Sequence, residues 1–158
     1  MLGLWGSQAG NIIMTFLISM VPVIELRGAI PIGVANGLDV WTALVVSVAG
    51  NLVPVPFIII FIRKIFFWLR SKSDRLNNIV TRLENRAAEK SAVIDKYEWF
   101  GLVILVAIPL PGTGAWTGAL VAAMLNMRLK RAFPAIFLGV VIAGLIVMYI
   151  TYGATVIL

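Results

Sequence analysis

Two charged residues, Glu25 and Arg27, stand inside a stretch of sequence that is otherwise apolar. If this stretch lies in a bilayer, each charge costs about 2.5–3.5 kcal/mol to insert at the membrane centre, so both residues are functional candidates. The planar guanidinium of Arg27 suits a phosphate or carboxylate group. The Glu25 carboxylate could bind and release a proton during a transport cycle. Alternatively, both residues only neutralise charge, with each other or with backbone groups across the fold.

The surrounding composition is that of a membrane protein. Of the 158 residues, 61% are hydrophobic and only 13% are charged, whereas a soluble domain has roughly 25% charged residues. Uncharged stretches cover residues 1–24, 40–62, 99–127 and 132–158, and each exceeds the ~18 residues that mark a candidate span. The N-terminus lacks the basic region of a secretory signal, so we expect the first stretch to remain in the protein.

Cysteine and histidine are both missing from the sequence. Their absence removes disulfides, thiolate and imidazole catalysis and most transition-metal sites. We therefore expect a protein that is not an enzyme and that uses neither a metal nor a cofactor. The net charge of +6 does not lead us to expect nucleic acid as a partner, because basic residues beside membrane spans report topology instead.

The hydrophobic residues form four blocks, two on each side of a polar segment at 63–98: 9–36 and 40–62, then 99–127 and 131–157. The first and third blocks are broken in the middle by Pro and Gly, which end helices or allow close backbone approach. Aligning Pro22 with Pro109 superimposes the two halves in this pattern. The sequence therefore predicts an internal repeat.

The lysines and arginines discriminate between two topologies. If all four blocks span the membrane, the nine basic residues of the polar segment and the three at 128–131 lie on opposite sides. If the first and third blocks are re-entrant hairpins, all twelve lie on one side, which the positive-inside rule favours. Length agrees, since one straight helix over 99–127 would be ~43 Å long, against a hydrocarbon core of ~30 Å.

The predicted fold is an all-α, multi-pass domain of the inner membrane, an inverted repeat of a re-entrant hairpin followed by a transmembrane helix. An amphipathic helix at 70–97 joins the halves on the cytoplasmic surface, and both termini lie outside. Backbone groups at a re-entrant turn must be buried in protein or line a wet cavity, so the two breaks should face each other. Because one chain offers little protein to bury both, we expect a homodimer.

The candidate residues for binding a substrate or ion cluster at the two breaks. The second arm of each hairpin starts there, so two helix N-termini, together with Arg27, would form an anion-seeking site. In the alternative interpretation, the Pro and Gly residues serve only the geometry of the breaks, and the Asn51 amide in the second block bonds a neighbouring helix. The full set is Glu25, Arg27, Pro31, Asn51, Pro109, Pro111, Gly112, Thr113, Gly114, Trp116 and Thr117.

Two motifs resemble those of a known family. Glu-Leu-Arg-Gly-Ala-Ile-Pro at 25–31 and Pro-Leu-Pro-Gly-Thr-Gly-Ala-Trp-Thr-Gly at 109–118 are similar to motifs of the small multidrug export proteins. The resemblance spans nearly the whole chain. That family is distantly similar to the DedA/VTT membrane proteins, which have paired re-entrant hairpins and include lipid-carrier transporters and scramblases. DedA proteins typically have an Arg in the second hairpin, whereas this chain has no charge there.

These observations together predict a secondary transporter, coupled to protons or another ion. Its substrate would be an anionic or amphipathic small molecule or a phosphate-bearing lipid. One alternative is an exporter of hydrophobic cations, which requires Glu25 to be accessible and Arg27 to be paired elsewhere. The other is an energy-independent lipid scramblase or a membrane scaffold.

Overall fold

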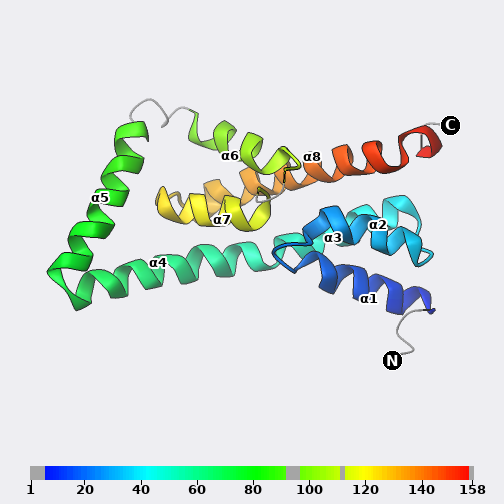
Figure 1. Cartoon of the computed structure of the whole chain (residues 1–158), viewed down its shortest axis with the longest axis horizontal. Helices are drawn as coiled ribbons and strands as arrows, with labels where there is room; N and C mark the ends of the chain where they lie inside the picture. The colour runs from blue at the N-terminus through cyan, green and yellow to red at the C-terminus, as the bar shows by residue number, and fades with distance from the viewer. Residues whose placement is uncertain (1–5, 92–96, 111–112, 157–158) are drawn as a thin grey trace.

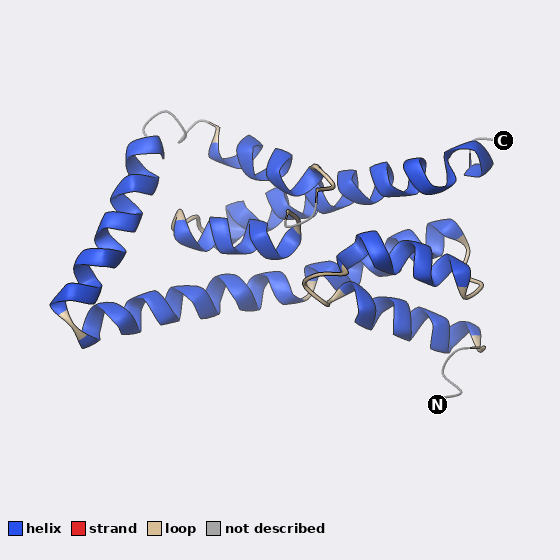
Figure 2. Ribbon diagram, in the orientation of Figure 1, coloured by secondary structure: helices blue, strands red, loops and turns tan. Residues whose placement is uncertain are grey.

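The computed structural model describes residues 6–91, 97–110 and 113–156, and its secondary structure there is entirely helical (Figures 1 and 2). The predicted all-α class is therefore confirmed for these residues. Its helices are α1 (Gln8–Ser19), α2 (Glu25–Ala35), α3 (Val40–Leu52), α4 (Pro54–Lys72), α5 (Asp74–Ser91), α6 (Glu98–Ala107), α7 (Ala115–Met124) and α8 (Leu129–Val156).

Within the described ranges, two helical segments are long and apolar enough to cross a membrane, Val40–Lys72 and Leu129–Gly153. The first combines α3 and α4, which meet at Val53, a residue with helical backbone angles. Pro54 follows it, and a proline removes one helical hydrogen bond and clashes with the preceding turn. The segment runs ten residues past the predicted boundary at 62, because its basic residues are interspersed with apolar ones and stay helical.

The amphipathic helix predicted over 70–97 begins at Asp74, after Ser73 adopts an extended conformation at the end of α4. It is described as far as Ser91, and residues 92–96 of the prediction lie outside the described residues. The helix lies across one end of the molecule (Figure 1). The start of α8, which directly follows Arg128 and contains Lys130 and Arg131, lies at the same end (Figure 1).

Two helical hairpins meet at the centre of the molecule. The α1–α2 hairpin extends from one end and the α6–α7 hairpin from the other, and their loops come together between the long helices (Figures 1 and 2). The start of α1 and the end of α8 both lie at the end opposite α5 (Figure 1). The helix breaks therefore occur where Pro and Gly predicted them, while re-entry into a membrane stays a prediction.

The same helix ending occurs in both halves, 89 residues apart. Gly37 and Asn126 follow α2 and α7 with left-handed φ angles of 95° and 56°. In each case the next N–H, of Leu38 or Met127, bonds to the carbonyl five residues earlier at 3.0 Å. This is the Schellman ending of an α-helix, in which a residue with positive φ closes the last turn.

The starts of the hairpins' second arms show the same spacing. Glu25 and Gly114, also 89 residues apart, both have positive φ angles, of 48° and 140°, and α3 and α8 begin 89 residues apart as well. The sequence register that aligned Pro22 with Pro109 is therefore wrong by two residues. Proline can occupy several positions of a helix break, whereas a positive φ marks one defined turn, so the prolines did not fix the register.

Besides packing within their own half, the hairpins contact the opposite half. The second arm of each hairpin contacts the long helix of the other half, α2 against α8 and α7 against α4. The first arms pack within their own half, where glycines allow close approach. A Cβ at Gly50 would overlap α1, and a Cβ at Gly139, again 89 residues later, would overlap α6. The correspondences favour an internal repeat.

Candidate functional site

Glu25 lies at the tip of the first hairpin, in contact with the second. Its side chain is 4% exposed, and its carboxylate accepts a hydrogen bond from the backbone N–H of Trp116 in the first turn of α7. Gly114, directly before α7, has no side chain at this contact, and a Cβ there would overlap the carboxylate. The first N–H groups of a helix lack partners and carry partial positive charge. Glu25 therefore caps α7 from the other hairpin.

Arg27 makes the complementary contact with the other side of the same break. Its Nη1 donates to the Leu110 carbonyl, and its Nη2 donates to the Ile108 carbonyl at 3.2 Å and the Thr113 hydroxyl at 3.0 Å. The Thr113 hydroxyl in turn donates to the Ile108 carbonyl at 2.7 Å. These carbonyls follow α6, where a helix end carries partial negative charge, so a cation is stabilised there.

Trp116 returns a contact from the second hairpin to the first. Its indole Nε1 donates to the Met20 carbonyl, just after α1, at 3.2 Å. Trp116 stands 89 residues after Arg27, so equivalent positions of the halves each donate to the carbonyl end of the opposite first arm. In the first hairpin, the Trp116 indole N–H therefore makes the helix-end contact that the Arg27 guanidinium makes in the second hairpin. The alignment of Pro22 with Pro109 is offset by two residues, so it did not pair Arg27 with Trp116.

The backbone of Glu25 is unusual as well. A φ of 48° is uncommon for a residue with a Cβ, and such conformations cost of order 1–3 kcal/mol. They persist only where surrounding contacts fix them, which here are the burial of the side chain and the cap on α7. A buried charge held in a strained conformation at a contact between two hairpins is a sound candidate for a functional group.

Asn51 lies in α3, fully buried, and neither its Nδ2 nor its Oδ1 has a hydrogen-bond partner among the described residues. Ser47, one turn earlier on α3, has a buried hydroxyl in the same condition. The interhelical hydrogen bond considered for Asn51 is thus not made within the described part of the chain. An unpaired buried amide costs about 1–3 kcal/mol, so Asn51 remains a candidate for contact with a bound molecule.

The remaining predicted residues lie close to this junction in the chain. Pro31 is inside α2, one turn after Arg27. Pro109 separates the two residues whose carbonyls Arg27 binds, and Thr117 follows Trp116 on α7. Pro111 and Gly112 lie outside the described residues. The structure therefore brings Glu25, Arg27, Thr113, Gly114 and Trp116 into one junction, as the facing breaks predicted.

An apolar groove of about 470 Å³ lies beside this junction. Among the described residues that line it, the charged one is Lys64, which lies roughly 15 Å along α4 from Pro54 at the other end. The residues that line it come from α4, with one from α7: Pro54, Phe57, Ile58, Ile60, Phe61, Lys64 and Trp116. The sequence did not predict this groove, because apolar residues that line a groove cannot be distinguished in sequence from those that face lipid.

The family described as “Putative small multi-drug export protein” matches residues 25–146 of the chain. The match begins at Glu25 and includes the second hairpin, all of α4 and most of α8. No curated protein and no solved structure is significantly similar to the chain. The expected similarity to DedA/VTT proteins stays a prediction.

Proposed function

The chain belongs to the small multi-drug export protein family, and from this membership we propose that it is a secondary transporter that exports an amphipathic small molecule in exchange for protons. The position of Trp116 carries the proposal. Its side chain lines the groove and bonds the first hairpin, while its backbone N–H bonds Glu25. A molecule in the groove therefore contacts the residue that joins the two hairpins.

The groove supports an amphipathic small molecule as the substrate. Its volume of about 470 Å³ lies within the ~300–1,000 Å³ of pockets for small molecules. Aromatic and aliphatic side chains line most of it, with Lys64 at one end. We assign it an apolar molecule with an anionic group at the Lys64 end. Arg27 is occupied by backbone carbonyls, which supports Lys64 rather than Arg27 as the group that meets the anion.

Glu25 supplies the coupling to protons in this proposal. Ionised Glu25 caps the positive end of α7, and protonation removes the charge that strengthens this hydrogen bond. The contact between the hairpins then weakens, and the two halves can rock against each other, as inverted repeats do in other transporters. No enzymatic reaction or cofactor enters the cycle.

The placement in the inner membrane is part of the proposal. We put the hairpin tips near the midplane, the end with α5 in the cytoplasm and both termini outside. The shared position of α5 and the basic start of α8 (Figure 1) supports re-entrant hairpins over four simple spans, because only the former bring these segments to one side. A homodimer remains part of the proposal, since one small chain has little protein to surround two irregular breaks.

Flux into proteoliposomes tests the transport proposal. With a fluorescent amphipathic anion and an imposed pH gradient, we expect the wild-type protein to give proton-driven flux. The flux through Glu25→Gln should be lower by about tenfold or more, as expected when a proton-transfer group is lost. Trp41→Phe, a change remote from the junction, is the control. Equal flux in Glu25→Gln would contradict proton coupling through this residue.

Two outcomes would replace the proposal with its alternatives. Lipid equilibration without a gradient, in the absence of solute flux, would indicate a scramblase. A cation exporter would transport a hydrophobic cation, with a higher flux in Lys64→Glu, and would not transport the anion. A protein that moves none of these molecules would be a scaffold.

A further inference from the structure

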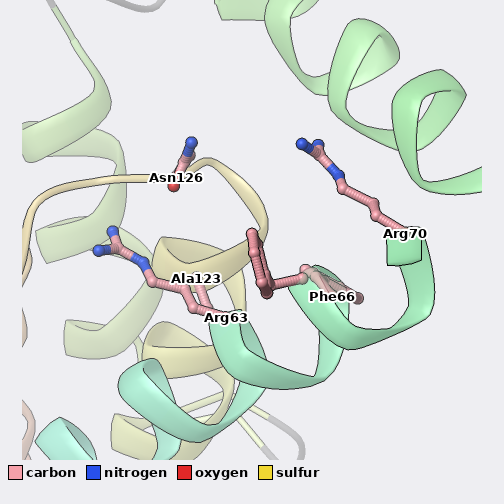
Figure 3. Close-up of a pocket in the computed structure, with 6 residues that line it drawn as sticks. Arg63, Phe66, Arg70, Ala123 and Asn126 are labelled. Carbon is pink, nitrogen blue, oxygen red and sulfur yellow. The ribbon is translucent and has the colours of Figure 1, made fainter. Parts of the chain in front are cut away.

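A second pocket lies at the basic end of the molecule, between α4 and the joint that follows α7 (Figure 3). Its volume is about 190 Å³, and it is lined by Arg63, Phe66, Phe67, Arg70, Ala123 and Asn126. We propose that this pocket binds the phosphate of an anionic phospholipid headgroup at the membrane surface. The inference does not depend on which molecule the protein transports.

Two arginines of the same helix face make the pocket suitable for a phosphate. Arg63 and Arg70 are seven residues apart, which is about two helical turns, and they lie on either side of Phe66 (Figure 3). Guanidinium groups match the geometry of phosphate oxygens. Arg63 is held in place because its Nη2 donates to the Met127 carbonyl. Its Nε is buried and has no hydrogen-bond partner among the described residues, which calls for a ligand or another acceptor.

Asn126 adds an amide across from the arginines (Figure 3). It occupies the left-handed position of the helix ending, where glycine is the residue without a steric cost. In the other half the equivalent residue is Gly37, and the joint after α2 contains no Lys or Arg. A polar side chain therefore stands at this ending only where the arginines are present. The pocket is a feature of the basic end and not of the repeat.

The position and size of the pocket favour a lipid headgroup. Phe67 of the pocket and the next residue on α4, Trp68, are 77% and 56% exposed, and Lys72 lies over the Trp68 ring at 4.8 Å. Aromatic and basic residues together are typical of the membrane–water interface. At about 190 Å³ the pocket is smaller than the ~300 Å³ usual for a whole small molecule, yet it can hold a phosphate group. Basic pockets between membrane helices on the cytoplasmic side bind acidic headgroups.

Binding there would tighten the helices that border the groove. Arg63 belongs to α4, and the Met127 carbonyl that it binds follows α7. A phosphate on Arg63, Arg70 and Asn126 would therefore connect α4 to the C-terminal end of α7. The N-terminal end of α7 is the one capped by Glu25. We expect anionic lipid to stabilise this packing.

The test measures lipid retained by the full-length protein. Protein purified in a mild detergent is titrated with phosphatidylglycerol or phosphatidylcholine, and bound lipid is counted by native mass spectrometry alongside the melting temperature. We expect preferential retention of phosphatidylglycerol, weakened about tenfold in Arg70→Gln and in Asn126→Gly, as for a lost charge-assisted hydrogen bond. Asn126→Gly retains a favourable backbone, so it should fold even if an Arg63 variant does not.

Arg128→Gln is the matched control, because it removes the same charge at the same end without lining the pocket. Unchanged phosphatidylglycerol retention in Arg70→Gln and Asn126→Gly would overturn the proposal, and so would an equal loss in Arg128→Gln. Two further arms add inorganic phosphate, one to protein with phosphatidylcholine only and one to protein with bound phosphatidylglycerol. If phosphate alone reproduced the full stabilisation and displaced phosphatidylglycerol, the ligand would be a soluble anion and the lipid assignment would fail.

Discussion

Glu25 and Arg27 are two residues apart, yet they serve opposite ends of the break in the second hairpin. The Glu25 carboxylate meets the N-terminal end of α7, and the Arg27 guanidinium meets the carbonyls that follow α6. Each charge is stabilised because a helix has a positive N-terminal and a negative C-terminal end. The backbone contacts across the fold that the structural interpretation of these residues predicted are thus present. The transport proposal uses the same contact, because in that proposal it weakens when Glu25 is protonated.

Gly114 provides the sharpest test of this contact at the scale of one residue. We expect Gly114→Ala to destabilise the protein by about 2 kcal/mol or more, because its Cβ would overlap the Glu25 carboxylate and its φ of 140° disfavours a side chain. The loss should appear as a lower melting temperature in detergent. Combining it with Glu25→Ala should recover only the part due to overlap.

Gly101 supplies the control for that substitution. It lies in α6, and a Cβ there would meet nothing within 4 Å. Because alanine is favoured over glycine in a helix interior by about 1 kcal/mol, Gly101→Ala should leave stability unchanged or raise it. An equal loss of stability in Gly114→Ala and Gly101→Ala would refute the proposed contact.

Among the helices, the close packing of each hairpin's first arm on its long helix depends on one glycine. We expect Gly50→Ala and Gly139→Ala each to cost about 1–3 kcal/mol, because the added methyl groups would overlap α1 and α6 respectively. Thermal unfolding of the two variants in the same detergent is the measurement. If the repeat is real, the two effects should be similar, and a large loss in one with none in the other would count against equivalent packing.

The helices and their breaks could be predicted because they depend on local sequence. Uncharged runs define the blocks, and Pro22 and Gly114 mark the interruptions. The contacts that Glu25 and Trp116 make could not be predicted, since each joins residues more than 85 positions apart through tertiary packing. The groove could not be predicted for a related reason. The exposed face of α4 is as apolar as a lipid-facing surface, and only the position of α7 defines the cavity.

At the scale of the whole molecule, the two long segments and the two hairpins give the chain two different ends. One end holds α5, the basic start of α8 and the arginine pocket, and the other holds the start of α1 and the end of α8 (Figure 1). The groove runs from Lys64 toward the hairpin tips. A substrate that binds from the basic end would therefore meet Lys64 before it reaches Trp116, which fits export from the cytoplasm.

The orientation of the two ends in the membrane can be tested with single introduced cysteines, since the natural chain contains no cysteine. We expect Arg75→Cys in α5 and Lys130→Cys in α8 to react with a membrane-impermeant maleimide only in inverted vesicles, because both lie at the basic end. Trp41→Cys, at the start of α3, should react only in right-side-out vesicles. Four simple spans would instead make Lys130→Cys label together with Trp41→Cys and opposite to Arg75→Cys, and that pattern would exclude re-entrant hairpins.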